Sequence, residues 1–245
     1  DGWRNKFFGY RYLKTTFEKT ESPVRVKAMN LYYHMYSGEN MAALSALLGN
    51  LDYISNQEII PIETYAYAGI GEGFYTTRFY AQDNGGVRIE NRGELNTIRF
   101  DRVSDLKADL AHCKGVLGCK SFQGSLYVAL DPAFDKPEIF LKKTDEVLRR
   151  PQIEDQIYLD SSRWRVSDLS HKNKLHIMFK AYGYGRPEMK WVVPKKGEYT
   201  VKIGQDNVQM IQVNVGDDHL LKLSPNIRNI LTPHQFEIIY DKNGA

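Results

Sequence analysis

Apolar and basic residues alternate over positions 24–28, and a run of mainly apolar and aromatic residues follows over 29–33. This pattern is typical of a strand that becomes buried on both faces. His34 stands where the predicted strand ends. Apolar residues then recur at helical spacing over 40–55, so the stretch predicts a strand followed by a helix, the βα unit of a parallel sheet.

His34 is the first candidate for chemistry. In parallel α/β folds, catalytic groups gather at the C-terminal ends of strands, and histidine changes its charge near neutral pH. A single histidine after a strand is, however, more often a structural residue than a catalyst. The residue pattern by itself leaves both interpretations open.

The segments around this unit give weaker signals. Residues 1–23 are aromatic and basic and suggest a strand or an irregular lead-in. A short apolar stretch at 58–62 predicts a further strand, which Pro61 would end. Thr64 could then cap a helix, but Gly69-x-Gly71-x-Gly73 would weaken or shorten it. These glycines follow no long strand and precede no Lys-Ser/Thr, which favours packing or a turn over phosphate binding.

The pattern changes after residue 74. Segments 75–80, 86–91 and 95–100 favour strands, and Asp-Asn-Gly-Gly at 83–86 favours a tight turn, so we expect an antiparallel meander. A short helix is expected within 101–115. A hairpin about Gln123-Gly124 follows.

Beyond residue 151, many short strand-like segments alternate with turn sequences, which predicts a β-sandwich or jelly roll. We therefore expect two regions. Residues 1–74 form an α/β segment with too few strands to close a parallel sheet, so they read as the end of a (β/α) domain that begins earlier. Residues 75–245 form an all-β C-terminal domain.

The composition narrows the class of protein. The 245 residues are 42% hydrophobic and 26% charged, which is ordinary for a globular protein. The net charge is only +3 and no long basic block occurs, so we expect no nucleic-acid partner. No apolar run has membrane-spanning length. The chain opens at Asp1 without Met or a signal peptide, and we expect it to be part of a longer protein.

Two histidine-containing groups are possible metal sites. His171 and His176 are an odd number of residues apart in a strand-like stretch, which would place them on opposite faces. Asp217-Asp218-His219 lies in a predicted hairpin turn, where a solvated turn is the stronger interpretation. The chain also lacks a Gly-x-Ser-x-Gly nucleophile motif and a phosphate-binding loop.

Aromatic residues give a second kind of candidate. The 16 tyrosines suit half-buried strands and carbohydrate grooves. Trp164, Trp191, Tyr182 and Tyr184 could stack on sugar rings, although core packing is favoured for the two tryptophans.

Residues 30–37, Asn-Leu-Tyr-Tyr-His-Met-Tyr-Ser, resemble the last motif of NodB-type polysaccharide deacetylases, carbohydrate esterase family four, in which an apolar strand ends in a histidine. An ordered series of short pieces over about residues 10 to 145 resembles the C-terminal part of the PelA-like exopolysaccharide deacetylases of this group. The pieces are Ala-Leu-Ser-Ala-Leu at 43–47, Ile-Pro-Ile at 60–62, Tyr-Ala at 65–66, Gly-Phe at 73–74, Leu-Asn-Thr-Ile-Arg-Phe at 95–100, Gly-Val-Leu-Gly at 115–118 and Leu-Tyr-Val at 126–128.

The resemblance implies roles for three residues. His34 would be the general acid that protonates the leaving amine. Tyr32 matches the position that lines the acetyl pocket, where the family usually has Leu, and Tyr36 is grouped with it as substrate-binding. A divalent metal, zinc in type, would be held by ligands outside this chain, because the family's metal-binding motifs do not occur in it.

The resemblance also implies a setting. The chain would belong to a periplasmic enzyme that removes N-acetyl groups from an amino-sugar exopolysaccharide during biofilm polysaccharide export. Its partners would be that polymer, the N-terminal remainder of the same protein and an export-complex protein. The chain alone is expected to be inactive. The alternative is a noncatalytic carbohydrate-binding or assembly module in which His34 is structural.

Cys113 and Cys119 are separated by a spacer with glycine at both ends, and spacing alone leaves free thiols and a disulfide open. Because the resemblance implies export to an oxidising compartment, it favours a disulfide slightly. A strand through Val116 would oppose the bridge, because an extended backbone would hold the two cysteines apart.

Overall fold

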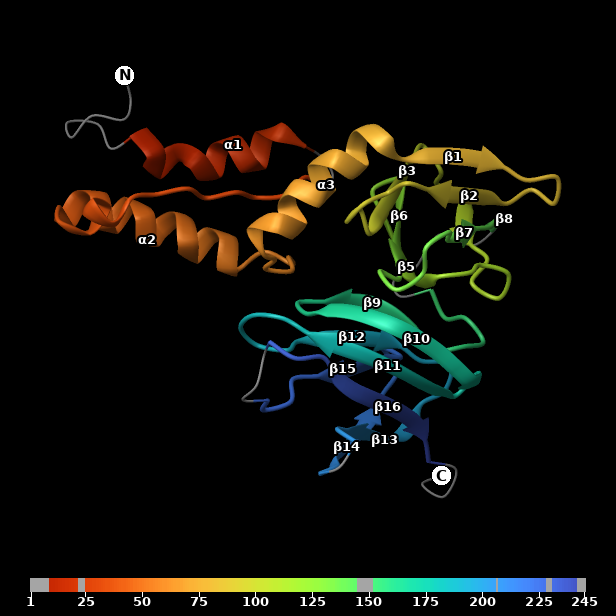
Figure 1. Cartoon of the computed structure of the whole chain (residues 1–245). Helices are drawn as coiled ribbons and strands as arrows, with labels where there is room; N and C mark the ends of the chain where they lie inside the picture. Colours follow the sequence, from red (N-terminus) through yellow and green to blue (C-terminus); the bar gives the residue numbers. More distant parts are fainter. Residues whose placement is uncertain (1–8, 22–24, 145–151, 206, 228–230, 242–245) are drawn as a thin grey trace. The chain divides into compact units, whose positions relative to one another are not determined.

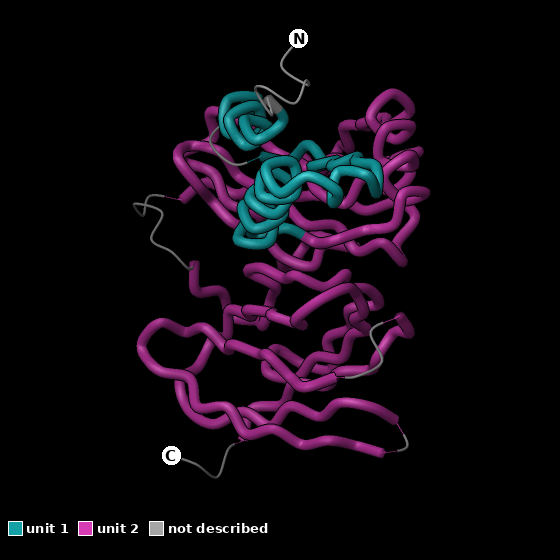
Figure 2. The backbone as a smooth tube through the Cα atoms, turned by 90° about the vertical axis from the view of Figure 1, so that its left-hand side faces the viewer, with its two compact units in different colours: residues 1–59 teal, residues 60–245 magenta. Residues whose placement is uncertain are grey.

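A computed structural model describes residues 9–21, 25–144, 152–205, 207–227 and 231–241 of the chain. The chain divides into two compact units, Asp1–Ile59 and Ile60–Ala245, which Figure 2 distinguishes by colour. The first unit is helical in its described residues, and the second contains one helix followed by strands. Each unit is described by itself.

The first unit is built on a pair of helices. Its elements are the 3₁₀ turn η1 (Gly9–Tyr12), α1 (Leu13–Thr20), the 3₁₀ turn η2 (Met35–Gly38) and α2 (Met41–Ser55). α2 begins after Asn40, whose side-chain Oδ1 accepts hydrogen bonds from the first-turn amides of Ala42 and Ala43. The helix predicted over 40–55 is thus confirmed, whereas the strand or irregular lead-in expected before residue 23 is wrong over η1 and α1.

Few contacts hold the two helices together. The rings of Phe17 in α1 and Tyr53 in α2 are stacked, with centroids 6.4 Å apart. Asn50 is buried, and its side-chain amide donates to the backbone oxygen of Tyr10 at 2.7 Å. This polar bond ties α2 to η1 and satisfies the buried amide nitrogen of Asn50, whereas its Oδ1 has no partner among the described residues.

The strand predicted to end at His34 is wrong. Residues 25–34 form no strand, and Tyr32 is 78% exposed instead of buried. Val24 lies outside the described residues. A strand forms only when a neighbouring strand satisfies its N–H and C=O groups, and the described residues of the first unit include none. The unit is therefore not the end of a (β/α) barrel, and the α/β part of the expected fold class is overturned.

The second unit opens with α3 (Thr64–Thr76). The strand expected at 58–62 is absent, and Glu63 rather than Thr64 precedes the helix, without a side-chain capping bond. α3 runs through all three glycines, and two of them, Gly69 and Gly73, pack too closely against neighbouring residues to carry a side chain. A Cβ on Gly73 would lie 2.0 Å from the backbone oxygen of Arg92, so only glycine lets the helix approach that turn so closely.

Three small antiparallel sheets follow α3, with strand orders β1-β2-β7, β3-β6-β5 and β4-β8 (Figure 1). Their strands are β1 (Arg78–Ala81), β2 (Val87–Glu90), β3 (Thr97–Asp101), β4 (Leu106–Ala108), β5 (Val116–Phe122), β6 (Ser125–Leu130), β7 (Glu138–Ile139) and β8 (Leu141–Lys143).

In this part of the chain the predicted hairpin turn is correct, whereas the predicted order of strand pairing is only partly correct. The hairpin about Gln123-Gly124 is confirmed, with both residues at positive φ as a tight hairpin requires. β1 and β2 pair as expected, but β3 pairs with β6 and does not continue a meander. The short helix expected within 101–115 is wrong, because β4 occupies part of that range and pairs with β8.

The C-terminal strands form two further sheets, ordered β10-β11-β16-β13-β14 and β15-β12-β9. They are β9 (Tyr158–Ser162), β10 (Arg165–Asn173), β11 (His176–Tyr182), β12 (Met189–Val192), β13 (Gly197–Ile203), β14 (Gln209–Val215), β15 (Leu220–Leu223) and β16 (His234–Tyr240). Side chains from both sheets share one hydrophobic core, which is the arrangement of a β-sandwich.

Aromatic rings fill the centre of this core. Phe179 stacks on Phe236 with ring centroids 5.0 Å apart, and the centroids of the Phe179 and Trp191 rings are 4.4 Å apart. Trp164 and Trp191 are fully buried. Their role is therefore core packing, as favoured from the sequence, and neither ring is available for stacking on a sugar.

β5 approaches β9 of the sandwich closely at Gly118. A Cβ at position 118 would lie 2.0 Å from the backbone oxygen of Leu159. Such a separation is far inside van der Waals contact, so one of the two strands would have to move. Gly118 is thus a point where the absence of a side chain permits packing within the second unit.

Gly118→Ala is expected to lower the free energy of unfolding by about 2 kcal/mol or more, because the added methyl group overpacks the β5–β9 contact. Chemical denaturation followed by tryptophan fluorescence measures the loss. Gly216→Ala is the matched control, since a Cβ at Gly216 meets nothing within 4 Å. Equal stability of the two variants would show that the close approach is not a constraint.

Candidate functional site

His34 is the last residue of the irregular segment 25–34, which leads into η2. Its backbone oxygen accepts a hydrogen bond from the amide of Ser37 at 3.0 Å, which closes the 3₁₀ turn. The side chain makes no capping bond and is exposed. The structure thus places His34 at the surface of the first unit, without the strand that was expected to carry it.

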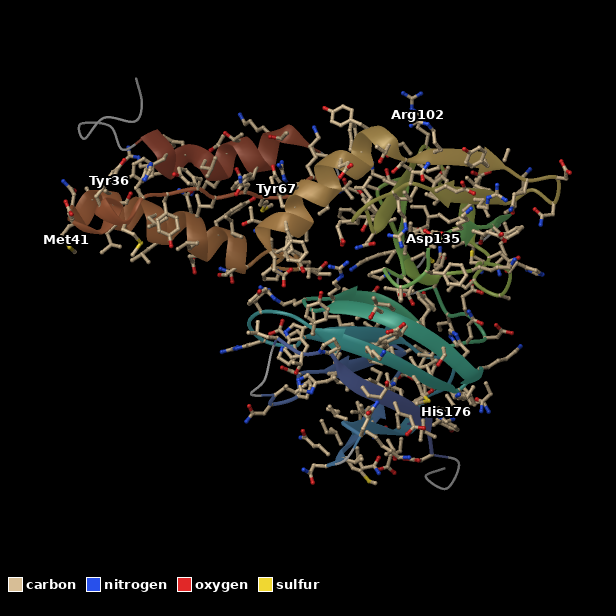
Figure 3. The ribbon with its side chains drawn as sticks, viewed as in Figure 1. Tyr36, Met41, Tyr67, Arg102, Asp135 and His176 are labelled. Atoms are coloured by element: carbon tan, nitrogen blue, oxygen red, sulfur yellow. The ribbon has the colours of Figure 1, made fainter. Side chains whose placement is uncertain are left out.

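The three residues that the sequence singled out lie together. The ring of His34 stacks on that of Tyr36, with centroids 4.9 Å apart and planes 10° from parallel. The rings of Tyr32 and His34 make a T-shaped contact, with centroids 5.1 Å apart and planes at 79°. We call Tyr32, His34 and Tyr36 the aromatic triplet. Figure 3 shows Tyr36 and Met41 at the same end of the first unit.

Local spacing produces the triplet. The three residues alternate with Tyr33 and Met35 across the point where the irregular segment turns into η2. Tyr36 is 64% exposed, so the triplet is a surface feature rather than part of a core. Aromatic rings left in water on a surface are the side chains that most often bind apolar faces of a ligand.

His34 differs from other histidines in its surroundings. The rings of four other histidines form hydrogen bonds of 2.7–2.9 Å. The partners of His112 and His176 are the carboxylates of Asp109 and Glu237, and the partners of His171 and His219 are the backbone oxygens of Ile157 and Val193. For His34, the described residues provide ring contacts but no hydrogen bond to either ring nitrogen. A ligand could therefore use both nitrogens.

The two histidine groups considered for metal binding have structural partners. His171 and His176 stand on separate strands of the β10–β11 hairpin, not on opposite faces of one strand, and each bonds elsewhere. The turn expected at 217–219 is confirmed, and ion pairs join Asp217 to Lys196 and Asp218 to Lys222. Over the part of the chain that is described, no three His, Cys, Asp or Glu residues are grouped to hold a metal ion.

Of the four strand aromatics considered for sugar binding, only the two tyrosines reach the surface. Tyr182 and Tyr184 are both half-buried. The hydroxyl of Tyr184 donates to the carboxylate of Glu63 at 3.1 Å, which occupies its polar end. These rings therefore present less free surface than the aromatic triplet does.

A buried polar pair in the second unit was not predicted from the sequence. Arg92 and Asp131 are each only 5% exposed. The guanidinium group of Arg92 donates to the backbone oxygens of Leu95, Asp131 and Phe134 and to the side chain of Asn96. Burial lowers the pKa of Arg92, although nearby carboxylates oppose that shift.

The Asp131 carboxylate connects β6 to β10. Oδ1 accepts from the amides of Ala133 and Asp168 at 2.9 and 3.0 Å, and Oδ2 accepts from the amide of Leu169 at 2.9 Å. Asp168 has a positive φ of 56° at an irregularity in the β10–β11 pairing. The carboxylate thus satisfies amides that a bulged strand leaves unpaired. Arg92-Gly93 is a turn-forming pair between β2 and β3, and a turn signal of this kind does not reveal burial.

Asp131→Asn is expected to lower the free energy of unfolding by about 1–3 kcal/mol, because an amide nitrogen replaces one acceptor that faces backbone N–H groups. Urea denaturation measures the difference. The control is Asp135→Asn, since Asp135 is exposed on the same loop (Figure 3). Similar stability of both variants would mean that the carboxylate does not hold β10.

The expected disulfide is wrong in this structure, because Cys113 and Cys119 are both free. Cys119 is carried into the core by β5, whose extended backbone begins at Val116. The sulfur of Cys113 instead bonds to the backbone of Phe140, accepting from its amide at 3.3 Å. Burial raises the pKa of Cys113 to about 11 and that of Cys119 to about 12.

Thiol titration is expected to find two reactive thiols in denatured protein that was never reduced. In the folded protein at about pH 8 both should react slowly, because their raised pKa values keep them protonated and burial blocks access. A chemically reduced sample sets the full count. Finding no thiols in the unreduced, denatured sample would show that a disulfide exists after all.

The described residues contain no helix long and apolar enough to cross a bilayer. Comparison of the chain with protein-family models, with curated proteins and with solved structures finds no match.

Proposed function

We propose that this chain is part of an exopolysaccharide N-deacetylase that acts on an amino-sugar polymer in the periplasm, with the aromatic triplet as the surface that meets the polymer. The proposal is supported by the ordered series of motifs and by one structural observation. His34 is exposed between two tyrosine rings, and no described residue bonds to its ring nitrogens.

The geometry suits a general acid. Hydrolysis of an N-acetyl group releases an amine, which must gain a proton as the C–N bond breaks. The flat contact with Tyr36 restrains the plane of the imidazole, and no described residue forms a hydrogen bond with its ring nitrogens. A protonated His34 ring can then donate to the departing nitrogen, and the neutral ring regains its proton from water.

The tyrosines would position the sugar. Tyr32 and Tyr36 expose ring surface beside His34, and aromatic faces pack against the apolar C–H face of a sugar ring. Their phenol groups add hydrogen-bond donors at the rim. In this arrangement the tyrosines determine the affinity for the sugar and its orientation, whereas His34 donates the proton to the leaving amine.

A divalent metal of the zinc type belongs to the proposal, because such an ion polarises an acetyl carbonyl and activates water. The described residues do not fit that ion, since none of them form a group that could hold it. Its ligands would come from outside this chain, and the proton transfer assigned to His34 does not depend on where they lie.

In the complete enzyme, His34→Ala is expected to lower kcat on an N-acetylated amino-sugar oligomer by about a hundredfold or more, because proton transfer to the amine is lost. Acetate release measures it, and the basic limb of the pH profile should disappear. Tyr36→Ala should mainly raise KM. His112→Ala is the matched control, since His112 is also exposed but pairs with Asp109. A His34→Ala enzyme within about twofold of wild type would remove His34 from the chemistry.

The second candidate function is a noncatalytic carbohydrate-binding or assembly module. The exposure of Tyr32 and Tyr36 favours it as well, because stacking on a polymer needs no proton transfer. Affinity electrophoresis of the 245-residue chain in a gel that contains the polymer separates the two functions. Retardation that Tyr36→Ala abolishes, combined with normal turnover of the His34→Ala enzyme, would establish the binding module.

A further inference from the structure

β1 is an edge strand with an unusual lack of cover. In the sheet ordered β1-β2-β7 it pairs on one side only, with β2. All four of its residues are exposed, including Phe79 at 57% and Tyr80 at 43%. Phe74 and Tyr75, just before it at the end of α3, are exposed too. Edge strands are usually protected, because an open edge pairs readily with another strand.

The register shows which backbone groups face the open edge. The amide of Gln82 donates to the oxygen of Gly86 across the β1–β2 turn at 2.9 Å. Hydrogen-bonded and non-bonded pairs alternate along an antiparallel ladder. Tyr80, two residues away, therefore points its N–H and C=O toward β2, whereas Phe79 and Ala81 point theirs outward.

The hydrogen bonds on the other side of β2, which faces away from β1, agree with this assignment. Ile89 is the partner of Phe79 in the register, and its amide donates to Pro137 on the side away from β1. The Phe79–Ile89 pair is thus a non-bonded pair within the β1–β2 ladder. Among the described residues, no strand pairs with the outward groups of Phe79 and Ala81.

This edge is complementary to itself. If two β1 strands meet antiparallel about Tyr80, Phe79 of each lies opposite Ala81 of the other, and their outward groups can form backbone hydrogen bonds in both directions. The large ring then faces a small methyl group. The two Tyr80 rings meet at a non-bonded pair, where side chains come closest and aromatic pairs are favourable. Arg78 is the only charge on β1, and it faces Gln82, so like charges are not opposed.

We propose that two copies of the chain associate through antiparallel pairing of their β1 strands. The paired edges join the β1-β2-β7 sheets of both copies into one continuous sheet about a two-fold axis. The exposed rings of Phe79 and Tyr80 are the apolar part of this interface. The proposal is independent of the deacetylase function, because it rests only on the second unit.

The contact is small, so the dimer should be weak and depend on concentration. Sedimentation equilibrium over about 5 to about 500 μM spans the range expected for a transient interface of this size. The mass should rise from 28.3 kDa toward twice that value. Ala81→Lys should hold the protein at the monomer mass, because the lysine of each copy would replace the small methyl group opposite Phe79 of the other with a long charged side chain. Met210→Lys should dimerise normally, since Met210 is 65% exposed on β14, the edge of another sheet.

A cysteine variant tests the register directly. Oxidation of Tyr80→Cys should give a covalent dimer at least about tenfold faster than oxidation of Met210→Cys, because only position 80 meets its own copy across the axis. A monomer mass at every concentration would overturn the proposal. Equal crosslinking rates, or equal effects of the two lysine variants, would overturn it as well, and so would a dimer that persists in Ala81→Lys.

Discussion

The buried contact between Asp131 and the bulge in β10 is the interaction on which the second unit depends. One carboxylate bonds three backbone amides, and the neighbouring Arg92 binds the backbone oxygens of the same loop and of the turn after β2. These buried hydrogen bonds join the small sheets to the β-sandwich, and water cannot reach the buried groups to take their place. Such networks strongly favour one arrangement, because any partial opening leaves unsatisfied groups.

Close backbone packing extends the same constraint. Gly73 lets α3 lie against the turn at Arg92, and Gly118 lets β5 lie against β9. The ion pair between Glu94 and Arg165 adds a link from that turn to β10. Helix, small sheets and sandwich in the second unit therefore form a connected whole. Asn50 is the only buried polar residue among the described residues of the first unit, and its hydrogen bond acts beside the stacked rings of Phe17 and Tyr53.

The candidate chemistry lies in the less constrained unit. The aromatic triplet is held by ring contacts and by the turn at η2, not by a buried shell of hydrogen bonds. Ring stacking can orient His34, but it leaves Tyr32 and Tyr36 open to solvent. A surface of this kind suits an extended polymer, whose sugar rings can lie across it without entering a closed pocket.

The sequence by itself determined the elements that local rules specify. Asn40 marked the start of α2, Gln123-Gly124 marked a hairpin, and the spacing of strands after residue 151 indicated the sandwich. These signals are encoded by neighbouring residues. The resemblance to the deacetylase motif also grouped Tyr32, His34 and Tyr36, and the rings of these three residues are in contact in the structure.

Only the tertiary structure decided the rest. The apolar run before His34 forms no strand because no described strand pairs with it, and its Tyr32 and Tyr33 are exposed. Pairing is a property of distant segments. The burial of Arg92 and Asp131 joins residues 39 positions apart, which no local pattern records. Cys119 stayed a free thiol because β5 carried it into a core formed by other strands. Contacts between residues far apart in the sequence thus decided whether each of these side chains is buried or exposed.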